Sequence, residues 1–153
     1  EAGLELLQSV LDGQSGLLFR DLRDVHGLGY TVTAFNWKTQ KAGMLVFYIG
    51  TEPQKMEEAE QGFRRIIGDL RSKPVEAEDI NRGKSQLNGD YYRSLQTVQA
   101  RSAEAATLNL LDRPLDASRR LVEDAQKVNA ATLQILAEKY LQPEKAYIIK
   151  VLP

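Results

Sequence analysis

The chain has 153 residues, of which 42% are hydrophobic and 27% charged, and its formal net charge is −1. This composition is typical of one globular domain with its own core, so we expect residues 1–153 to form a single domain. A net charge near zero offers no basic field for nucleic acid, and the absence of cysteine excludes disulfides, thiolate metal sites and a cysteine nucleophile. No apolar run approaches the roughly 18 residues of a transmembrane helix. The sequence therefore predicts neither a nucleic-acid nor a membrane partner.

Hydrophobic periodicity predicts the elements of the first third of the chain. Apolar residues at helical spacing predict a helix over residues 4–11. A second, short helix is expected to start at Ser15, a candidate N-cap, and to stop at Gly27. Two runs of β-forming residues, 28–35 and 44–49, predict strands that pair as an antiparallel hairpin.

The remaining chain is predicted to be helical, with one closing strand. The expected elements are helices over residues 56–72, 76–111 (bent near 95–98), 115–125 and 132–141, and a strand over residues 145–152. This order predicts an α+β fold in which a small antiparallel sheet carries helices on one face.

Three strands are few for so many helices, which predicts that one or more strands are missing before Glu1. The chain also starts without methionine, so we expect it to be a piece of a longer protein. A sheet truncated in this way has an unpaired strand edge, and such edges favour self-association.

Arg23 and Tyr30 are the candidate functional pair. The first lies in the last turn of the short helix and the second at the start of the strand, so one tight turn at Gly27 holds both. A guanidinium presents several donors in a fixed fork, and a tyrosine hydroxyl can donate to an oxygen that gains negative charge. This combination suits peptide hydrolysis. The alternative is structural: an arginine paired with Asp21 or Asp24, and a tyrosine that anchors a strand.

The sequence encodes no obvious metal site. His26 is the single histidine, and its place beside Gly27 predicts an exposed turn residue. Three nearby acids, at positions 57, 58 and 60, are interpreted as solvating charges on a helix face. No serine nucleophile motif and no phosphate-binding loop are present. Any metal must therefore be held by another domain or subunit.

The run from Ser15 to Val32 resembles the C-terminal, non-metal domain of the pitrilysin/insulinase-like zinc metallopeptidases. It fits the family pattern L-F-x-x-L-R-x-x-x-G-L-A/G-Y-x-V, with Arg23 and Tyr30 at the positions of the family's substrate-binding pair. Later stretches resemble further family patterns in the same order: residues 42–51, 75–89 and 129–144. The departures from the patterns, Gly16, Leu17 and Gly83, lie outside the pair.

The resemblance implies that this chain is the substrate-binding, closing domain of a zinc-dependent endopeptidase. Arg23 and Tyr30 would then be catalytic residues that act on a peptide substrate at a zinc ion. That ion would belong to another domain or subunit, and this chain alone would bind no metal and cleave nothing. Two alternatives stay open. One is a non-catalytic, architectural relative like the core subunits of respiratory complexes, and the other is the non-metal subunit of a two-chain peptidase.

Overall fold

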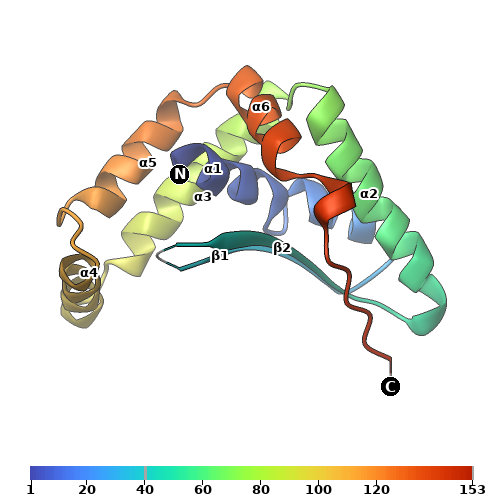
Figure 1. Ribbon diagram of the computed structural model, residues 1–153, viewed down its shortest axis with the longest axis horizontal. Helices are drawn as coiled ribbons and strands as arrows, with labels where there is room; N and C mark the ends of the chain where they lie inside the picture. Colours follow the sequence, from blue (N-terminus) through green and yellow to red (C-terminus); the bar gives the residue numbers. More distant parts are fainter. Residues whose placement is uncertain (40, 153) are drawn as a thin grey trace.

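Helices arch over one face of a two-stranded hairpin in the computed structural model, which describes residues 1–39 and 41–152 (Figure 1). The elements are α1 (Ala2–Leu11), the π-helix η1 (Phe19–Val25), β1 (Thr31–Lys38), β2 (Gly43–Gly50), the 3-10 helix η2 (Pro53–Lys55), α2 (Met56–Ser72), α3 (Ala77–Ser94), α4 (Val98–Leu110), α5 (Ala117–Lys127), α6 (Ala130–Tyr140) and the 3-10 helix η3 (Pro143–Lys145). The predicted α+β class, with helices on one face of a small antiparallel sheet, is confirmed.

The hairpin has the expected alternation of buried and exposed side chains. β1 and β2 pair antiparallel, with Thr31 opposite Gly50. Val32 and Ala34 point toward the helices and are buried, whereas Phe35 on the other face is 44% exposed. Successive side chains of a strand point to opposite faces, so the apolar pattern of β1 fixes which face receives the helices.

α1 is the centre of the core. It lies between β1 and the outer helices α3, α5 and α6, and it contacts all four of these elements (Figure 1). Four of its apolar side chains have no exposed surface: Leu6, Leu7, Val10 and Leu11. A helix buried on most sides needs apolar residues around much of its circumference, which explains the apolar character of the predicted helix over residues 4–11.

Polar side chains at the end of α1 bind the outer edge of β1. The Asp12 carboxylate accepts hydrogen bonds from the Thr33 hydroxyl at 2.7 Å and from the Ala34 amide at 3.1 Å. The Gln8 amide donates to the Ala34 carbonyl oxygen at 3.0 Å. The central backbone groups of this edge are therefore satisfied without a third strand.

The long predicted helix over residues 76–111 is two helices in the structure. α3 ends at Ser94, and α4 starts at Val98, close to where the sequence predicts a bend. The Thr97 hydroxyl accepts a hydrogen bond from the Ala100 amide at 3.1 Å and so caps α4. An N-cap residue has non-helical backbone angles, and this cap replaces the expected bend with a break.

The predicted closing strand over residues 145–152 is wrong. After η3, residues 146–152 form no strand with any described residue, and Tyr147 and Ile149 are 99% and 86% exposed. The ammonium group of Lys150 instead lies 2.7 Å from the Glu60 carboxylate and 3.4 Å from that of Glu57. β-forming residues make a strand only where a neighbouring strand offers backbone partners.

Candidate functional site

η1 carries Arg23 and differs from the expected α-helix. Residues Phe19–Val25 form a π-helix, and the amide of His26 donates to the carbonyl oxygen of Asp21, five residues earlier, at 3.2 Å. No side chain caps its start, so the N-cap predicted at Ser15 is wrong. The π-helix could not be read from residue propensities, because it differs from an α-helix only in hydrogen-bond register. Such segments are rare and occur frequently at functional sites.

Gly27 closes η1 and turns the chain toward β1. Its φ is +61°, and no atom lies within 4 Å of the Cβ that another residue would add. Glycine is therefore needed here for its backbone angle. The Gly27 amide donates to the Arg23 carbonyl oxygen at 2.9 Å, and the Leu28 amide donates to that of Leu22 at 2.7 Å. The helix end that bears Arg23 is thus fixed to the turn.

The end of β2 holds the other side of this turn. A Cβ on Gly29 would lie 2.5 Å from the carbonyl oxygen of Gly50, so only glycine permits this approach. The hydroxyl of Thr51 donates to the carbonyl oxygen of Leu28. β1 consequently starts at Thr31, later than predicted, because residues 27–30 form the turn.

Arg23 and Tyr30 lie side by side. The guanidinium carbon of Arg23 is 4.7 Å from the centre of the Tyr30 ring and 4.3 Å from the centre of the Phe19 ring. Arg23 is half-buried, whereas Tyr30 is 80% exposed. The sequence predicts that one turn holds the pair together, and the distances agree with this. Both side chains reach solvent.

The structural alternative for Arg23, an ion pair with Asp21 or Asp24, is absent from the structure. Within residues 1–39 and 41–152, no carboxylate lies within 4.0 Å of the Arg23 guanidinium. Asp21 instead binds Arg65 at 2.7 Å. The hydrogen-bond donors of Arg23 are therefore not engaged by an acid of this part of the chain.

His26 and the acids of α2 do not form a metal site. His26 is exposed, as predicted, and its Nδ1 lies 2.8 Å from the carbonyl oxygen of Asp21. Glu57 and Glu60 bind Lys150. Across the described ranges, no three His, Asp or Glu side chains are arranged to hold a metal ion. Zinc ordinarily takes three or four such ligands, so the described residues do not fit a zinc site.

Within residues 1–39 and 41–152, every helix is too short or too polar to span a bilayer.

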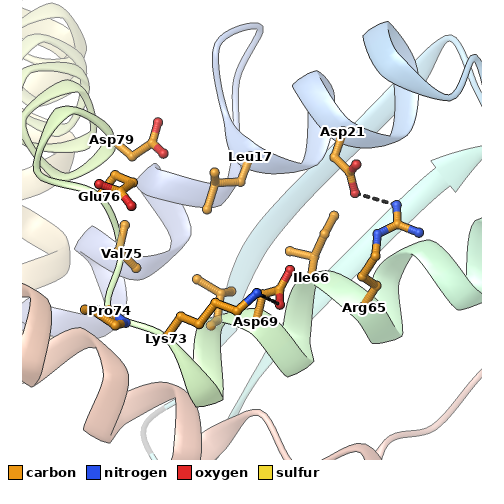
Figure 2. A pocket seen from close by; sticks show the side chains of 11 residues that line it. Leu17, Asp21, Arg65, Ile66, Asp69, Lys73, Pro74, Val75, Glu76 and Asp79 are labelled. Carbon is orange, nitrogen blue, oxygen red and sulfur yellow. Dashed lines mark hydrogen bonds and ion pairs between the residues drawn. The ribbon is translucent and has the colours of Figure 1, made fainter.

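A depression of about 320 Å³ lies where η1, α2 and the start of α3 meet (Figure 2). Neither Arg23 nor Tyr30 lines it. Three of its acids form ion pairs with neighbours: Asp21 with Arg65 at 2.7 Å, Asp69 with Lys73 at 2.9 Å, and Asp79 with Arg20 at 2.8 Å and Arg82 at 3.1 Å. Two of these ion pairs, Asp21–Arg65 and Arg20–Asp79, join different elements, so these charged residues have a structural role.

Comparisons with known proteins agree with the resemblance. Residues 1–87 match the family described as the peptidase M16 inactive domain. A relative in Bacillus subtilis, the uncharacterized zinc protease YmxG, is 26% identical over 132 residues. The match covers 86% of this chain and 32% of that protein, so the chain spans about a third of the length of this relative.

Solved structures show the same fold. An inactive peptidase domain from Bordetella parapertussis has a TM-score of 0.80 at 20% identity, and the match covers 99% of this chain and 83% of that one. A protease from Helicobacter pylori has a TM-score of 0.78 at 16% identity, over 93% of this chain and 35% of that one. At these identities the structures bear on the fold alone. The family match, which spans more than half of the sequence, shows that this chain belongs to the peptidase M16 inactive-domain family of zinc proteases.

Proposed function

We propose that this chain is the domain of a zinc-dependent endopeptidase that closes over the bound peptide. In this proposal Arg23 and Tyr30 supply hydrogen-bond donors to the substrate, and another domain or subunit holds the zinc. The observation that best supports this proposal is the contact between the two side chains. The guanidinium carbon of Arg23 lies 4.7 Å from the centre of the Tyr30 ring, and both side chains reach solvent. We also propose that residues 1–153 act as a single domain.

The two side chains suit different parts of peptide hydrolysis. The phenol of Tyr30 can donate to the carbonyl oxygen of the scissile bond as negative charge builds on it. The fork of Arg23 can bind a neighbouring carbonyl oxygen or a carboxylate through two parallel N–H groups. Because no acid of the described chain is paired with Arg23, a peptide that reaches the pair has no ion pair to break.

The relatives support a site shared between domains. The Bacillus subtilis relative is named a zinc protease, and this chain spans 32% of it, which leaves ample chain for a zinc-bearing domain. Among the described residues, no group of side chains is able to hold that metal. In this proposal the partners of the chain are therefore a peptide and a zinc-bearing domain or subunit.

Two other arrangements predict different behaviour. An architectural relative would use Arg23 and Tyr30 only for stability, and the lack of an acid partner for Arg23 argues against such a structural use. A two-chain peptidase would keep the same pair and place the zinc on the partner chain. Zinc content and hydrolysis measured on each purified chain, apart and mixed, separate this arrangement from a single-chain enzyme.

The proposal is tested with steady-state kinetics of a zinc-loaded protein that contains this chain. Arg23→Ala should lower kcat/KM mainly through a higher KM, since a charged anchor that binds the ground state and the transition state alike contributes uniform binding. Loss of a hydrogen bond to a charged group costs about 1.5–3 kcal/mol, or roughly 10- to 150-fold in kcat/KM.

Arg101→Ala, an exposed arginine of α4, is the matched control and should leave kcat/KM unchanged. Zinc content and the unfolding temperature should be the same in all three proteins. Wild-type kinetics for Arg23→Ala in a folded, zinc-loaded protein would show that Arg23 has no part in hydrolysis.

A further inference from the structure

Phe19 is the second ring that contacts the Arg23 guanidinium. The two residues lie four positions apart in η1, and the guanidinium carbon is 4.3 Å from the centre of the Phe19 ring. Tyr30 contacts the same guanidinium from across the turn, at 4.7 Å. The arginine is therefore held by two aromatic contacts that come from different elements.

The burial of η1 indicates that Phe19 is not simply a core residue. The sequence places Phe19 on one apolar face with Leu18 and Leu22, and both leucines are buried, with at most 1% of their surface exposed. Phe19 is only half-buried. Part of its ring is thus left at the surface, where it contacts Arg23.

Stacking on an aromatic ring restricts an arginine in a useful way. The attraction between a cation and a ring face is strongest when the guanidinium lies over the ring, and its N–H groups then point outward along their own plane. A flexible arginine loses side-chain entropy when it binds a substrate. An arginine already held by a ring has lost part of that freedom before binding, so it binds more tightly.

We propose that Phe19 is a positioning residue for Arg23. This inference rests on the proposed function of Arg23 and adds how the donor is oriented. Of the two rings, Phe19 is the fixed one, because it is half-buried in a helix, whereas the Tyr30 ring is 80% exposed. Phe19 itself does not touch the substrate.

The first test uses the purified chain and no enzymatic assay. The side-chain Nε–H resonance of Arg23, assigned by its loss in Arg23→Lys, should be displaced by the ring currents of the stack. Phe19→Leu should move it toward the position of a free arginine, and Phe19→Tyr, which keeps a ring, should not. Phe63→Leu is the matched control, since Phe63 packs on Phe47 at 5.8 Å. An unchanged resonance in Phe19→Leu would overturn the inference.

The second test uses the zinc-loaded protein that contains this chain. Phe19→Leu should raise KM about two- to fivefold, the size of an exposed cation–π contact, and Phe19→Tyr should restore it. In an Arg23→Ala background, Phe19→Leu should have no further effect on KM, because the group that it positions is gone.

The outcomes separate the two claims. Suppose that Arg23→Ala impairs hydrolysis. If Phe19→Leu then has no effect on KM, or raises KM equally in the wild-type and Arg23→Ala backgrounds, the positioning role is refuted and the function of Arg23 stands. If Arg23→Ala leaves hydrolysis unchanged, the proposed function fails, and the resonance of Arg23 still decides whether Phe19 holds it.

Discussion

The guanidinium carbon of Arg23 lies 4.7 Å from the centre of the Tyr30 ring, although Arg23 belongs to the end of η1 and Tyr30 is the last residue of the turn before β1. Only the turn over residues 27–30 joins them. The turn is held by backbone hydrogen bonds to η1 and by the hydroxyl of Thr51 at the end of β2. Changes to these contacts are therefore expected to alter the geometry of the pair.

The backbone angle of Gly27 should make a measurable contribution to stability. Gly27→Ala forces an L-residue into the left-handed region, at a cost of roughly 1–2 kcal/mol. Gly68→Ala is the control: it also meets no atom within 4 Å, but it lies within α2 at an ordinary φ. That substitution should stabilise the chain by about 0.5–1 kcal/mol. The free energy of unfolding of both variants, measured in urea, checks this difference. Equal changes in the two variants would show that the positive φ of Gly27 does not contribute to stability.

Asp12 should be important for the contact between α1 and the hairpin. Asp12→Ala leaves the amide of Ala34, a residue with no exposed surface, without its acceptor. An unsatisfied buried donor costs about 1–3 kcal/mol in the free energy of unfolding. Asp124→Ala, which removes an exposed acid paired with Lys127, should cost no more than about 0.5 kcal/mol. A small effect of Asp12→Ala, matching the control, would contradict this account of the β1 edge.

The C-terminal segment should detach at acid pH. The hydrogen bond from Lys150, with a second from Arg64 and a smaller opposing effect of desolvation, lowers the pKa of Glu60 below its usual 4.5. The bond to Glu60 raises the pKa of Lys150 above 10.5. The pair is therefore intact at neutral pH. It is lost as pH falls through the lowered pKa of Glu60 or rises through the raised pKa of Lys150.

Backbone NMR relaxation of Val151 should report this release, with fast motion appearing below pH 4.5 as Glu60 is protonated. Lys150→Gln should show the same motion already at neutral pH. A rigid Val151 in the acid range, or a rigid one in Lys150→Gln, would mean that the ion pair does not hold the segment.

Self-association through a strand edge stays a prediction, and the structure suggests which edge to test. Polar side chains of α1 bind the outer edge of β1, while the outer edge of β2 has no backbone partner in the described part of the chain. The isolated chain should therefore gain mass with concentration in sedimentation velocity. Tyr48→Lys places a charge on β2 and should shift the association equilibrium of the chain toward the monomer. Tyr92→Lys on α3 should leave that equilibrium unchanged. A monomer at every concentration would contradict the prediction.

Much of the fold could be predicted from local pattern. The helical spacing of apolar residues predicts α1, α2, α5 and α6, and the two β-forming runs predict the hairpin. The proximity of Arg23 and Tyr30 followed from Gly27, because a glycine at a helix end reverses the chain. These features depend on residues that are neighbours in the sequence, and therefore leave a local signal.

The features that could not be predicted depend on distant partners or on hydrogen-bond register. Residues 146–152 have a strong β-propensity, but no strand among the residues that the structure describes pairs with them. The π-helix changes only the register of its hydrogen bonds. By sequence Phe19 is one more residue of an apolar helix face, and its partial burial and its contact with Arg23 distinguish it from Leu18 and Leu22.

The catalytic role of Tyr30 is tested most directly by kcat of Tyr30→Phe in a zinc-loaded protein that contains this chain. The substitution removes one hydroxyl and keeps the ring that stacks on Arg23. If that hydroxyl donates to the developing oxyanion, kcat should fall roughly 100- to 1000-fold, while zinc content, unfolding temperature and the Tyr92→Phe control stay unchanged. A wild-type kcat for Tyr30→Phe with full zinc content would contradict the account and leave the domain an architectural role.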